Sequence, residues 1–260
     1  MSEDPDYSLF IKKIKEFTSI DLSQYKEAQM KRRLTTLWTK KGYTSFVSFF
    51  DGLMKDKALF YEFLDRMTIN VSEFWRNPNR WELVEQKFVP EMLRKNRRLK
   101  IWSAACSTGE EPYTLAMILA KHGALADAQL IASDIDDGAL DKARKGVYAE
   151  RSLKDVPETY VKTYFRQDGM IFHVSDELKR SVKFQKQNLL LDGFDSGFDL
   201  IVCRNVIIYF TEEAKHVLYQ KFANALKPGG LLFVGSTEQI FTPGQYGLEP
   251  AETFFYRKKV

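Results

Sequence analysis

Apolar residues in the first 75 residues recur with helical spacing, and no good strand pattern occurs among them. One helix is predicted over residues 22–41, with Asp21 or Ser23 as its cap and Gly42 as its stop. One face of this helix collects four apolar residues, which are Met30, Leu34, Leu37 and Trp38. Two further segments rich in Phe, Leu and Tyr predict helices over 45–55 and 59–68. The N-terminal part of the chain is therefore predicted to be a small helical domain.

After about residue 98 the pattern changes to short apolar strands that alternate with amphipathic helices. Strands are predicted at 99–105, 130–133, 182–187, 198–203 and 231–235. Helices are predicted at 112–122, 137–145 and 212–226. Strands alternating with helices indicate an α/β fold with a parallel, doubly wound sheet. A turn is predicted at the KPGG sequence of 227–230, and the final segment, 252–258, is predicted to pair antiparallel.

A small hairpin is predicted inside this α/β region. Asp168 and Gly169 form a typical two-residue turn between two short alternating runs. We therefore expect an inserted antiparallel β-subdomain at about 160–187. The predicted domain limits are a helical domain at 1–75, a linker at 76–98 and an α/β domain at 99–260.

Composition excludes several classes of protein. Of the 260 residues, 44% are hydrophobic and 28% are charged, which argues against a disordered chain. No apolar run of 18 residues occurs, and the acidic start lacks the apolar core of a secretory signal, so we expect a cytoplasmic protein. Cys106 and Cys203 cannot form a disulfide framework. The three histidines are scattered, so no metal site is expected.

The net charge of +4 is unevenly distributed. Residues 10–50 hold nine Lys or Arg against three Asp or Glu. The predicted helix over 22–41 carries a polar stripe beside its apolar face, and the stripe comprises Lys26, Gln29, Arg33, Thr36 and Lys40. Such a stripe is either a solvated helix face or a docking surface for an acidic partner.

The carboxyl ends of the predicted parallel strands are expected to carry the ligand site. The turn after the first strand holds one glycine, so it lacks GxGxxG, and no P-loop is present, which disfavours NAD and ATP. Asp134, after the second strand, could accept hydrogen bonds from a ribose. Glu111 and Arg76 could hold the ammonium and carboxylate of S-adenosylmethionine. Alternatively, Glu111 merely favours a helix N-terminus and Asp134 caps the next helix.

Six segments in order make the sequence resemble the chemotaxis receptor methyltransferases, which use S-adenosylmethionine to methylate glutamate side chains of chemoreceptors. These segments are TINVSEFWR (68–76), WSAACSTGEEPY (102–113), ASDID (132–136), NLL (188–190), CRNVIIYF (203–210) and LKPGGLLFVGSTE (226–238). The resemblance covers nearly the whole chain. It implies a class I methyltransferase fold, with a Rossmann-like sheet whose last strand is antiparallel, a helical N-terminal domain and an inserted antiparallel β-subdomain.

The resemblance also implies roles for individual residues. It implies that Arg76 and Tyr209 lie beside the transferred methyl. The cofactor contacts that it implies are Asn70, Ser72, Arg76, Glu111, Asp134, Asn188, Leu189, Arg204 and Asn205. It implies docking of the N-terminal domain on the methylation helices of chemoreceptors, and the docking residues that we assign are Lys26, Arg32, Arg33 and Lys40. We expect a monomer without metal, nucleic acid or membrane insertion.

Two alternative functions are weighed against this one. A nucleic-acid methyltransferase could use the basic domain to track phosphates. However, the chain has neither a [DN]PP[YF] motif nor a Pro-Cys nucleophile at 203–205. The other alternative is a regulatory module that binds S-adenosylmethionine without catalysis. The presence of both Arg76 and Tyr209 argues against that module.

Overall fold

The computed structural model describes residues 4–68 and 72–260, and the chain forms two compact units. The N-terminal unit consists of Met1–Asn70 together with Val206–Leu218. The sheet unit consists of Val71–Asn205 together with Tyr219–Val260. Within the described residues, no helix is both long enough and apolar enough to cross a membrane.

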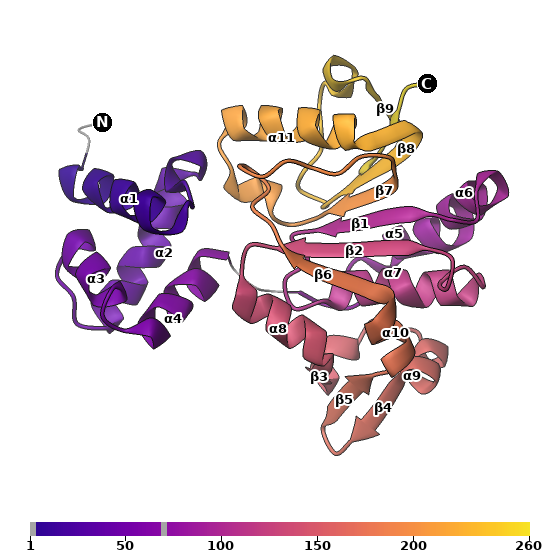
Figure 1. Ribbon diagram of the computed structural model, residues 1–260, viewed down its shortest axis with the longest axis horizontal. Helices are drawn as coiled ribbons and strands as arrows, with labels where there is room; N and C mark the ends of the chain where they lie inside the picture. The colour runs from indigo at the N-terminus through magenta and orange to yellow at the C-terminus, as the bar shows by residue number, and fades with distance from the viewer. Residues whose placement is uncertain (1–3, 69–71) are drawn as a thin grey trace. The chain divides into compact units, whose positions relative to one another are not determined.

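The N-terminal unit is helical where it is described, as predicted (Figure 1). Its N-terminal segment forms α1 (Pro5–Thr18), α2 (Glu27–Lys40), α3 (Phe46–Leu53) and α4 (Lys57–Thr68), with a 3₁₀ turn at Leu22–Gln24. Its second segment adds a 3₁₀ turn at Ile207–Tyr209 and the first part of α11 (Glu212–Ala225). Phe10, Phe49 and Phe63 are fully buried among them, and their ring centroids lie 6.2–6.3 Å apart. Aromatic packing of this kind gives the small unit a core.

Helix α2 begins at Glu27 rather than at residue 22, where the sequence pattern placed its start. The residues before it pair with a segment that is distant in the sequence. Tyr25 forms an antiparallel bridge with Phe210, and the backbone N–H of Lys26 donates to the carbonyl of Tyr209 at 2.8 Å. Backbone groups that form these hydrogen bonds are not available for the hydrogen bonds of a helix. The prediction of the helix start was therefore wrong because of a tertiary contact.

A seven-stranded sheet forms the centre of the sheet unit, with the order β6-β2-β1-β7-β8-β10-β9. Its strands are β1 (Lys100–Ala104), β2 (Gln129–Asp134), β6 (Val182–Lys186), β7 (Phe198–Cys203), β8 (Leu226–Val234), β9 (Leu248–Glu252) and β10 (Phe255–Lys258). The strands from β6 to β8 pair in parallel, whereas β10 pairs antiparallel with β8 and β9. The predicted parallel sheet with an antiparallel last strand is confirmed. Strand β8 already starts at Leu226, so the predicted KPGG turn lies within a strand.

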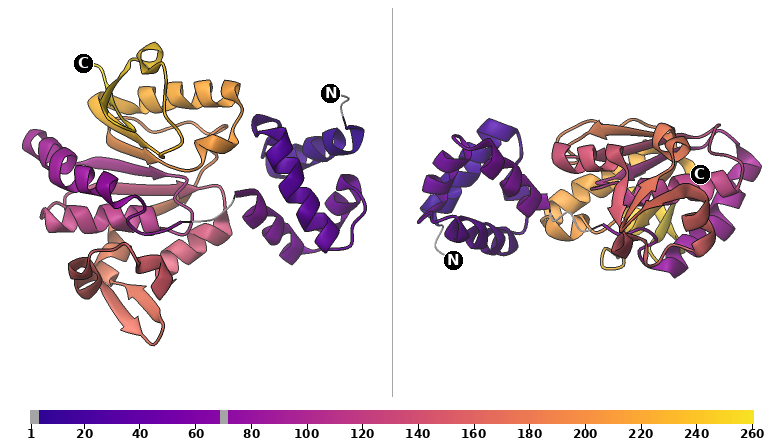
Figure 2. Two further views of the ribbon diagram at one scale, coloured as in Figure 1. Left: turned by 180° about the vertical axis from the view of Figure 1, so that it is seen from behind. Right: turned by 90° about the horizontal axis from the view of Figure 1, so that it is seen from below.

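Helices pack against the strands of the sheet. The longer helices of this part of the chain are α7 (Glu110–Lys121), α8 (Asp137–Lys145) and α11 (Glu212–Ala225). Helices α7 and α8 pack against β2 and β6, as the opposite views in Figures 1 and 2 also show. On the other face of β1, Trp102 packs against Phe222 of α11 at 5.6 Å between ring centroids.

The segment 76–98, which was predicted as a linker, is largely helical. It comprises α5 (Pro78–Leu83), a π-helical turn (Val84–Phe88) and α6 (Val89–Lys95). Trp81, Val84 and Phe88 are at most 1% exposed and belong to the core of the sheet unit. Their spacing of three and four residues is typical of a helix. This part of the chain is therefore a structural element, and the other domain limits stay a prediction.

The predicted inserted β-subdomain is confirmed as a separate antiparallel sheet with the order β3-β5-β4. Its strands are β3 (Val147–Ala149), β4 (Phe165–Asp168) and β5 (Ile171–Val174). The Asp168–Gly169 turn joins β4 to β5, and Gly169 has a φ of +60°. The short helices α9 (Glu158–Tyr164) and α10 (Asp176–Ser181) flank the small sheet. Strand β3 was not predicted, because three residues are too few to show a pattern.

Candidate active site

The chain turns sharply between β1 and α7, at the carboxyl edge of the sheet. Ala105, Ser107 and Gly109 have φ values of +60°, +48° and +97°. Such backbone costs about 1–3 kcal/mol for a residue with a side chain, and it concentrates at binding sites. A Cβ on Gly109 would lie 2.8 Å from the Cβ of Ala143, so glycine allows α7 to approach α8 closely. The turn therefore has a specific shape that a ligand can approach.

Glu111, in the first turn of α7, places a largely buried carboxylate in the candidate site. The hydroxyl of Ser103 donates to its Oε1 at 2.7 Å, and Nη1 of Arg204 lies 3.9 Å from its Oε2. The side chain is only 12% exposed. Burial raises the pKa of Glu111 to about 7, although the charges of Arg204 and Arg76 and the Ser103 hydroxyl oppose this shift. Near neutral pH this carboxylate would gain from a cationic ligand.

Arg204, directly after β7, is the buried cation of the site. Its Nη2 donates to the carbonyl of Arg76 at 2.9 Å and to Oδ1 of Asn77 at 2.7 Å. Its guanidinium lies over the rings of Phe233 and Trp81, at 4.7 and 5.4 Å from their centroids. Burial lowers the pKa of Arg204, and the charge of Glu111 partly offsets this shift.

Two buried donors of this cluster lack an acceptor within the described residues. They are Nε of Arg204 and Nε1 of Trp81. Buried donors in native proteins are nearly always satisfied, so a ligand or water is expected to supply the acceptor. The methionine end of S-adenosylmethionine carries a carboxylate, which would suit these donors, and an ammonium group, which would suit Glu111. The residues of this cluster therefore fit the cofactor.

Arg76 lies next to this cluster. Its charge lowers the pKa of both Glu111 and Arg204, which places its guanidinium near both groups. The residues on either side, Trp75 and Asn77, have φ values of +55° and +64°. The backbone around Arg76 is thus held in an unfavourable conformation, as is common where a side chain must be placed for function.

The predicted ribose-binding acid and the pair Asn188–Leu189 come together at neighbouring strand ends. Oδ2 of Asp134 accepts a hydrogen bond from the backbone N–H of Ser107 at 2.7 Å. Burial raises the pKa of Asp134 to about 6, although such backbone hydrogen bonds lower it. The backbone N–H of Gln187 donates to the carbonyl of Asp134 at 2.9 Å, so Asn188 and Leu189 follow directly beside it. Asn188 caps its own turn by accepting from Leu190 at 3.0 Å. These residues can form the nucleoside part of the site.

Glu238, for which no role was predicted from the sequence motifs, joins the ends of β7 and β8. Its Oε2 accepts from the backbone N–H groups of Asn205 at 2.8 Å and of Gly235 at 2.7 Å. A Cβ on Gly235 would lie 2.5 Å from that oxygen and 2.9 Å from the nitrogen of Asn205. The two strand ends can approach this closely only with glycine there. The sequence offered one sign of this role, because Glu238 ends the GSTE sequence that directly follows a predicted strand.

The structure describes only part of the motif segment that precedes Arg76. Asn70 lies outside the described residues. Ser72 hydrogen-bonds to the carboxylate of Glu110, which Thr108 also contacts at 2.7 Å. Burial raises the pKa of Glu110. Ser72 therefore contacts the first acid of the GEEPY sequence, and its predicted contact with the cofactor stays a prediction.

Comparison with known proteins identifies the family. Residues 70–255 match the family described as CheR methyltransferase, SAM binding domain, and residues 5–68 match the CheR methyltransferase, all-alpha domain. The chain belongs to the CheR methyltransferase family. It is 44% identical over 254 residues to a chemotaxis protein methyltransferase of Listeria monocytogenes, covering 97% of both chains. It is 33% identical to one of Borreliella burgdorferi, covering 97% of this chain and 94% of the relative.

Membership of the CheR family confirms the resemblance seen in the sequence. The chain is an S-adenosylmethionine-dependent methyltransferase with a class I fold. Within the described residues, no group of three or more His, Cys, Asp or Glu side chains could hold a metal ion.

Tyr209, the other predicted catalytic residue of this CheR-family chain, belongs to the N-terminal unit. There the guanidinium of Arg33 lies 4.9 Å from the centroid of the Tyr209 ring. Nη1 of Arg33 donates to the carbonyl of Met67, at the end of α4, at 2.8 Å. Arg33 is half-buried, whereas Arg32 and Lys40 are exposed. Arg33 therefore links α2 to α4 and to Tyr209, and it is less available for docking than predicted.

These contacts predict a different role for two neighbouring arginines of equal charge. Arg33→Met should lower the free energy of unfolding by about 1–3 kcal/mol, because it removes a charged hydrogen bond and the contact with Tyr209. Arg32→Met should change it by less than about 0.5 kcal/mol, because Arg32 is exposed. Chemical denaturation of both variants measures the difference. Equal effects would contradict the structural role of Arg33.

Proposed function

We propose that the chain is a protein-glutamate O-methyltransferase, which converts glutamate side chains of chemoreceptors to methyl esters. Relatives over nearly the full length are chemotaxis protein methyltransferases, which supports a chemoreceptor as the acceptor. The observation that carries the proposal is the cluster of Arg76, Glu111 and Arg204 at the carboxyl edge of the sheet. It combines a site for the cofactor with a guanidinium that can hold an acceptor carboxylate.

The proposed reaction needs no proton transfer. A glutamate side chain has a pKa of about 4.3, so the acceptor is already ionised at neutral pH. Bound S-adenosylmethionine would supply its methyl group, with the S–CH₃ bond breaking as the carboxylate oxygen forms an O–CH₃ bond. Glu111 and Asp134 then act as binding groups and not as general bases. Catalysis depends on orientation, which can supply about 7–11 kcal/mol of the barrier at best.

Arg76 is proposed to orient the acceptor carboxylate. A guanidinium presents paired donors that fix both carboxylate oxygens. Too strong a pair would stabilise the bound substrate as much as the transition state, so its contribution is alignment. Methylation removes the negative charge of the acceptor and weakens this interaction. The esterified product would therefore leave more easily than the substrate.

Docking through α2 is proposed to depend on its exposed basic residues, Arg32 and Lys40. Replacing both by Glu should raise KM for a receptor fragment about tenfold at low salt, because electrostatic attraction brings the partners together. The increase should shrink at high salt, where charges are screened. A matched control replaces two exposed lysines outside α2, Lys12 and Lys55, by Glu. Equal values of KM for the two double variants would contradict this docking surface.

The proposed function is tested with methyl-labelled S-adenosylmethionine and cytoplasmic chemoreceptor fragments. The labelled protein is then exposed to mild alkali. Label released as methanol identifies a carboxyl ester and supports the proposal. Alkali-stable label identifies methyl on nitrogen or carbon and excludes it. Absence of label despite cofactor binding would favour a nucleic-acid acceptor or a regulatory module.

A further inference from the structure

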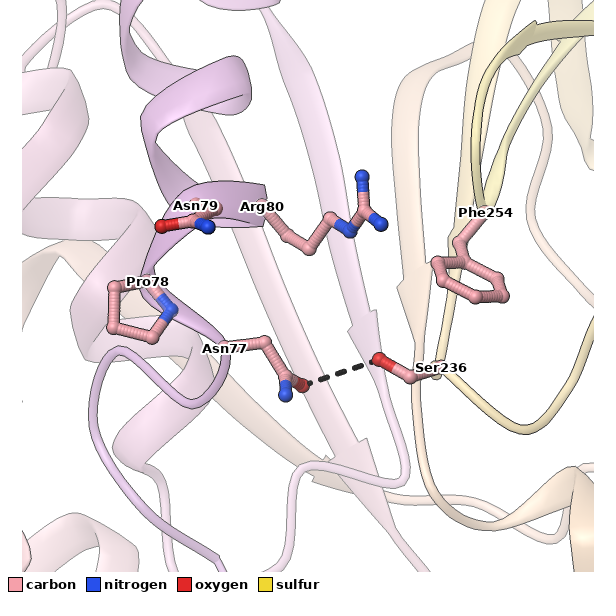
Figure 3. A pocket seen from close by; sticks show the side chains of 6 residues that line it. All are labelled: Asn77, Pro78, Asn79, Arg80, Ser236 and Phe254. Carbon is pink, nitrogen blue, oxygen red and sulfur yellow. Dashed lines mark hydrogen bonds between the residues drawn. The ribbon is translucent and has the colours of Figure 1, made fainter.

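A groove of about 410 Å³ opens in the sheet unit beside the active-site residues (Figure 3). It is lined by Asn77, Pro78, Asn79, Arg80, Ser236 and Phe254. Its volume is in the range of sites that bind small ligands or side chains. Three segments that are distant in the sequence meet here: the start of α5, the end of β8 and the turn between β9 and β10.

The walls of the groove are held in place by buried contacts. Trp81, next to Arg80, is 1% exposed and packs edge-on against Phe233 of β8 at 5.5 Å between ring centroids. The backbone N–H of Val234 donates to the carbonyl of Phe254 at 3.0 Å, which ties the β9–β10 turn to β8. Phe254 itself has a φ of +70°. The groove is therefore a fixed feature of the sheet unit.

The groove is chemically suited to an anion. The guanidinium carbon of Arg80 lies 5.1 Å from the centroid of the Phe254 ring, and Figure 3 shows the side chain reaching toward that ring. Stacking on an aromatic ring leaves the N–H groups at the edge of a guanidinium free to bind two oxygens. Arg80 forms no ion pair with any described residue, and no carboxylate lines the groove. The other lining groups include amides and a hydroxyl, which can donate hydrogen bonds.

The groove also shares a residue with the active-site cluster. Oδ1 of Asn77 accepts from Arg204 at 2.7 Å and from the hydroxyl of Ser236 at 3.4 Å, the bond drawn in Figure 3. Asn77 directly follows Arg76, which is proposed to hold the acceptor carboxylate. A protein acceptor that places one glutamate at Arg76 would therefore have neighbouring side chains close to Arg80.

We propose that this groove binds a second carboxylate of the acceptor protein, an Asp or Glu side chain near the methylated glutamate, with Arg80 as the specificity-determining residue. The inference rests on the proposed function and adds a rule for choosing among glutamates. A glutamate with an acidic neighbour in the correct position is preferred, and an uncharged amide in that position is a weaker partner.

The test uses helical receptor fragments that contain a single methylatable glutamate. A second residue, either Asp or its amide Asn, is placed at each position from four before to four after that glutamate. For the wild-type enzyme, kcat/KM should be about five- to tenfold higher with Asp at one or more positions, mainly through KM. Arg80→Gln should reduce this preference to less than about twofold. Arg80→Lys keeps the positive charge but lacks the paired N–H donors of a guanidinium, so it should retain part of the preference.

The matched control is Arg94→Gln, which removes the same charge from an exposed position on α6 and should keep the full preference. Equal kcat/KM for Asp and Asn fragments with the wild-type enzyme, or an unchanged preference in Arg80→Gln, would overturn the inference while leaving ester formation intact. Alkali-stable label, or none on any fragment, would overturn the proposed function and this inference together.

Discussion

Replacing Arg76 by alanine is expected to lower kcat about 100- to 1000-fold, the usual effect of removing a donor that positions reacting oxygens. Without its guanidinium the acceptor carboxylate loses its alignment with the methyl group. The loss should appear chiefly in kcat, because the acceptor also binds through other surfaces. Steady-state methylation of a receptor fragment measures it, and binding of S-adenosylhomocysteine should stay detectable in the same variant.

Two further variants separate orientation from charge. Arg76→Lys keeps the positive charge but not the paired donors, so it should recover only a small part of the activity. Arg94→Ala, at an exposed site on α6, removes an arginine elsewhere and should keep full activity. Unchanged turnover in Arg76→Ala would exclude Arg76 from the catalytic site.

Binding of S-adenosylhomocysteine is expected to weaken about tenfold between pH 8 and pH 6, because Glu111 is protonated in this range. Burial raises its pKa to about 7, and only the ionised form attracts the ammonium of the ligand. Glu111→Gln should bind about 10- to 100-fold more weakly at pH 8 and should lose most of this dependence on pH. Isothermal titration calorimetry across this range measures both effects.

The pKa of Glu111 also predicts an effect on the stability of the ligand-free protein. Its folded-state pKa is above the value of 4.5 that is usual for this side chain, so ionisation of the buried group opposes folding as the pH rises from 4.5 to 7. Glu111→Gln should therefore raise the melting temperature at pH 8. Asp134, with a pKa of about 6, accounts for the dependence of binding that remains around pH 6 in this variant. A Glu111→Gln protein with wild-type affinity at pH 8 would contradict the role of this carboxylate.

Much of the candidate site could be predicted because its residues lie at the ends of strands or in the turns and helix starts that follow them. Glu111, Asp134, Asn188 and Arg204 come after different predicted strands, and parallel strands end at one edge of a sheet. The order of the motifs then identified the family. Glu238 and Trp81 were missed because their roles depend on contacts with distant backbone and on an unsatisfied buried nitrogen. Neither a contact with distant backbone nor an unsatisfied buried nitrogen can be predicted from a local sequence pattern.

Periodicity and turn residues are local properties of a chain, so they were enough to predict the α/β sheet, the helical N-terminal domain, the inserted hairpin and the edge of the sheet where the cofactor is expected to bind. The start of α2, by contrast, depends on long-range contacts, because the backbone of Tyr25 pairs with Phe210 and the backbone N–H of Lys26 donates to the carbonyl of Tyr209. The tertiary structure also decided that Arg33 contacts Tyr209 while Arg32 remains exposed. The two arginines are adjacent and identical in the sequence, and long-range packing alone distinguishes them.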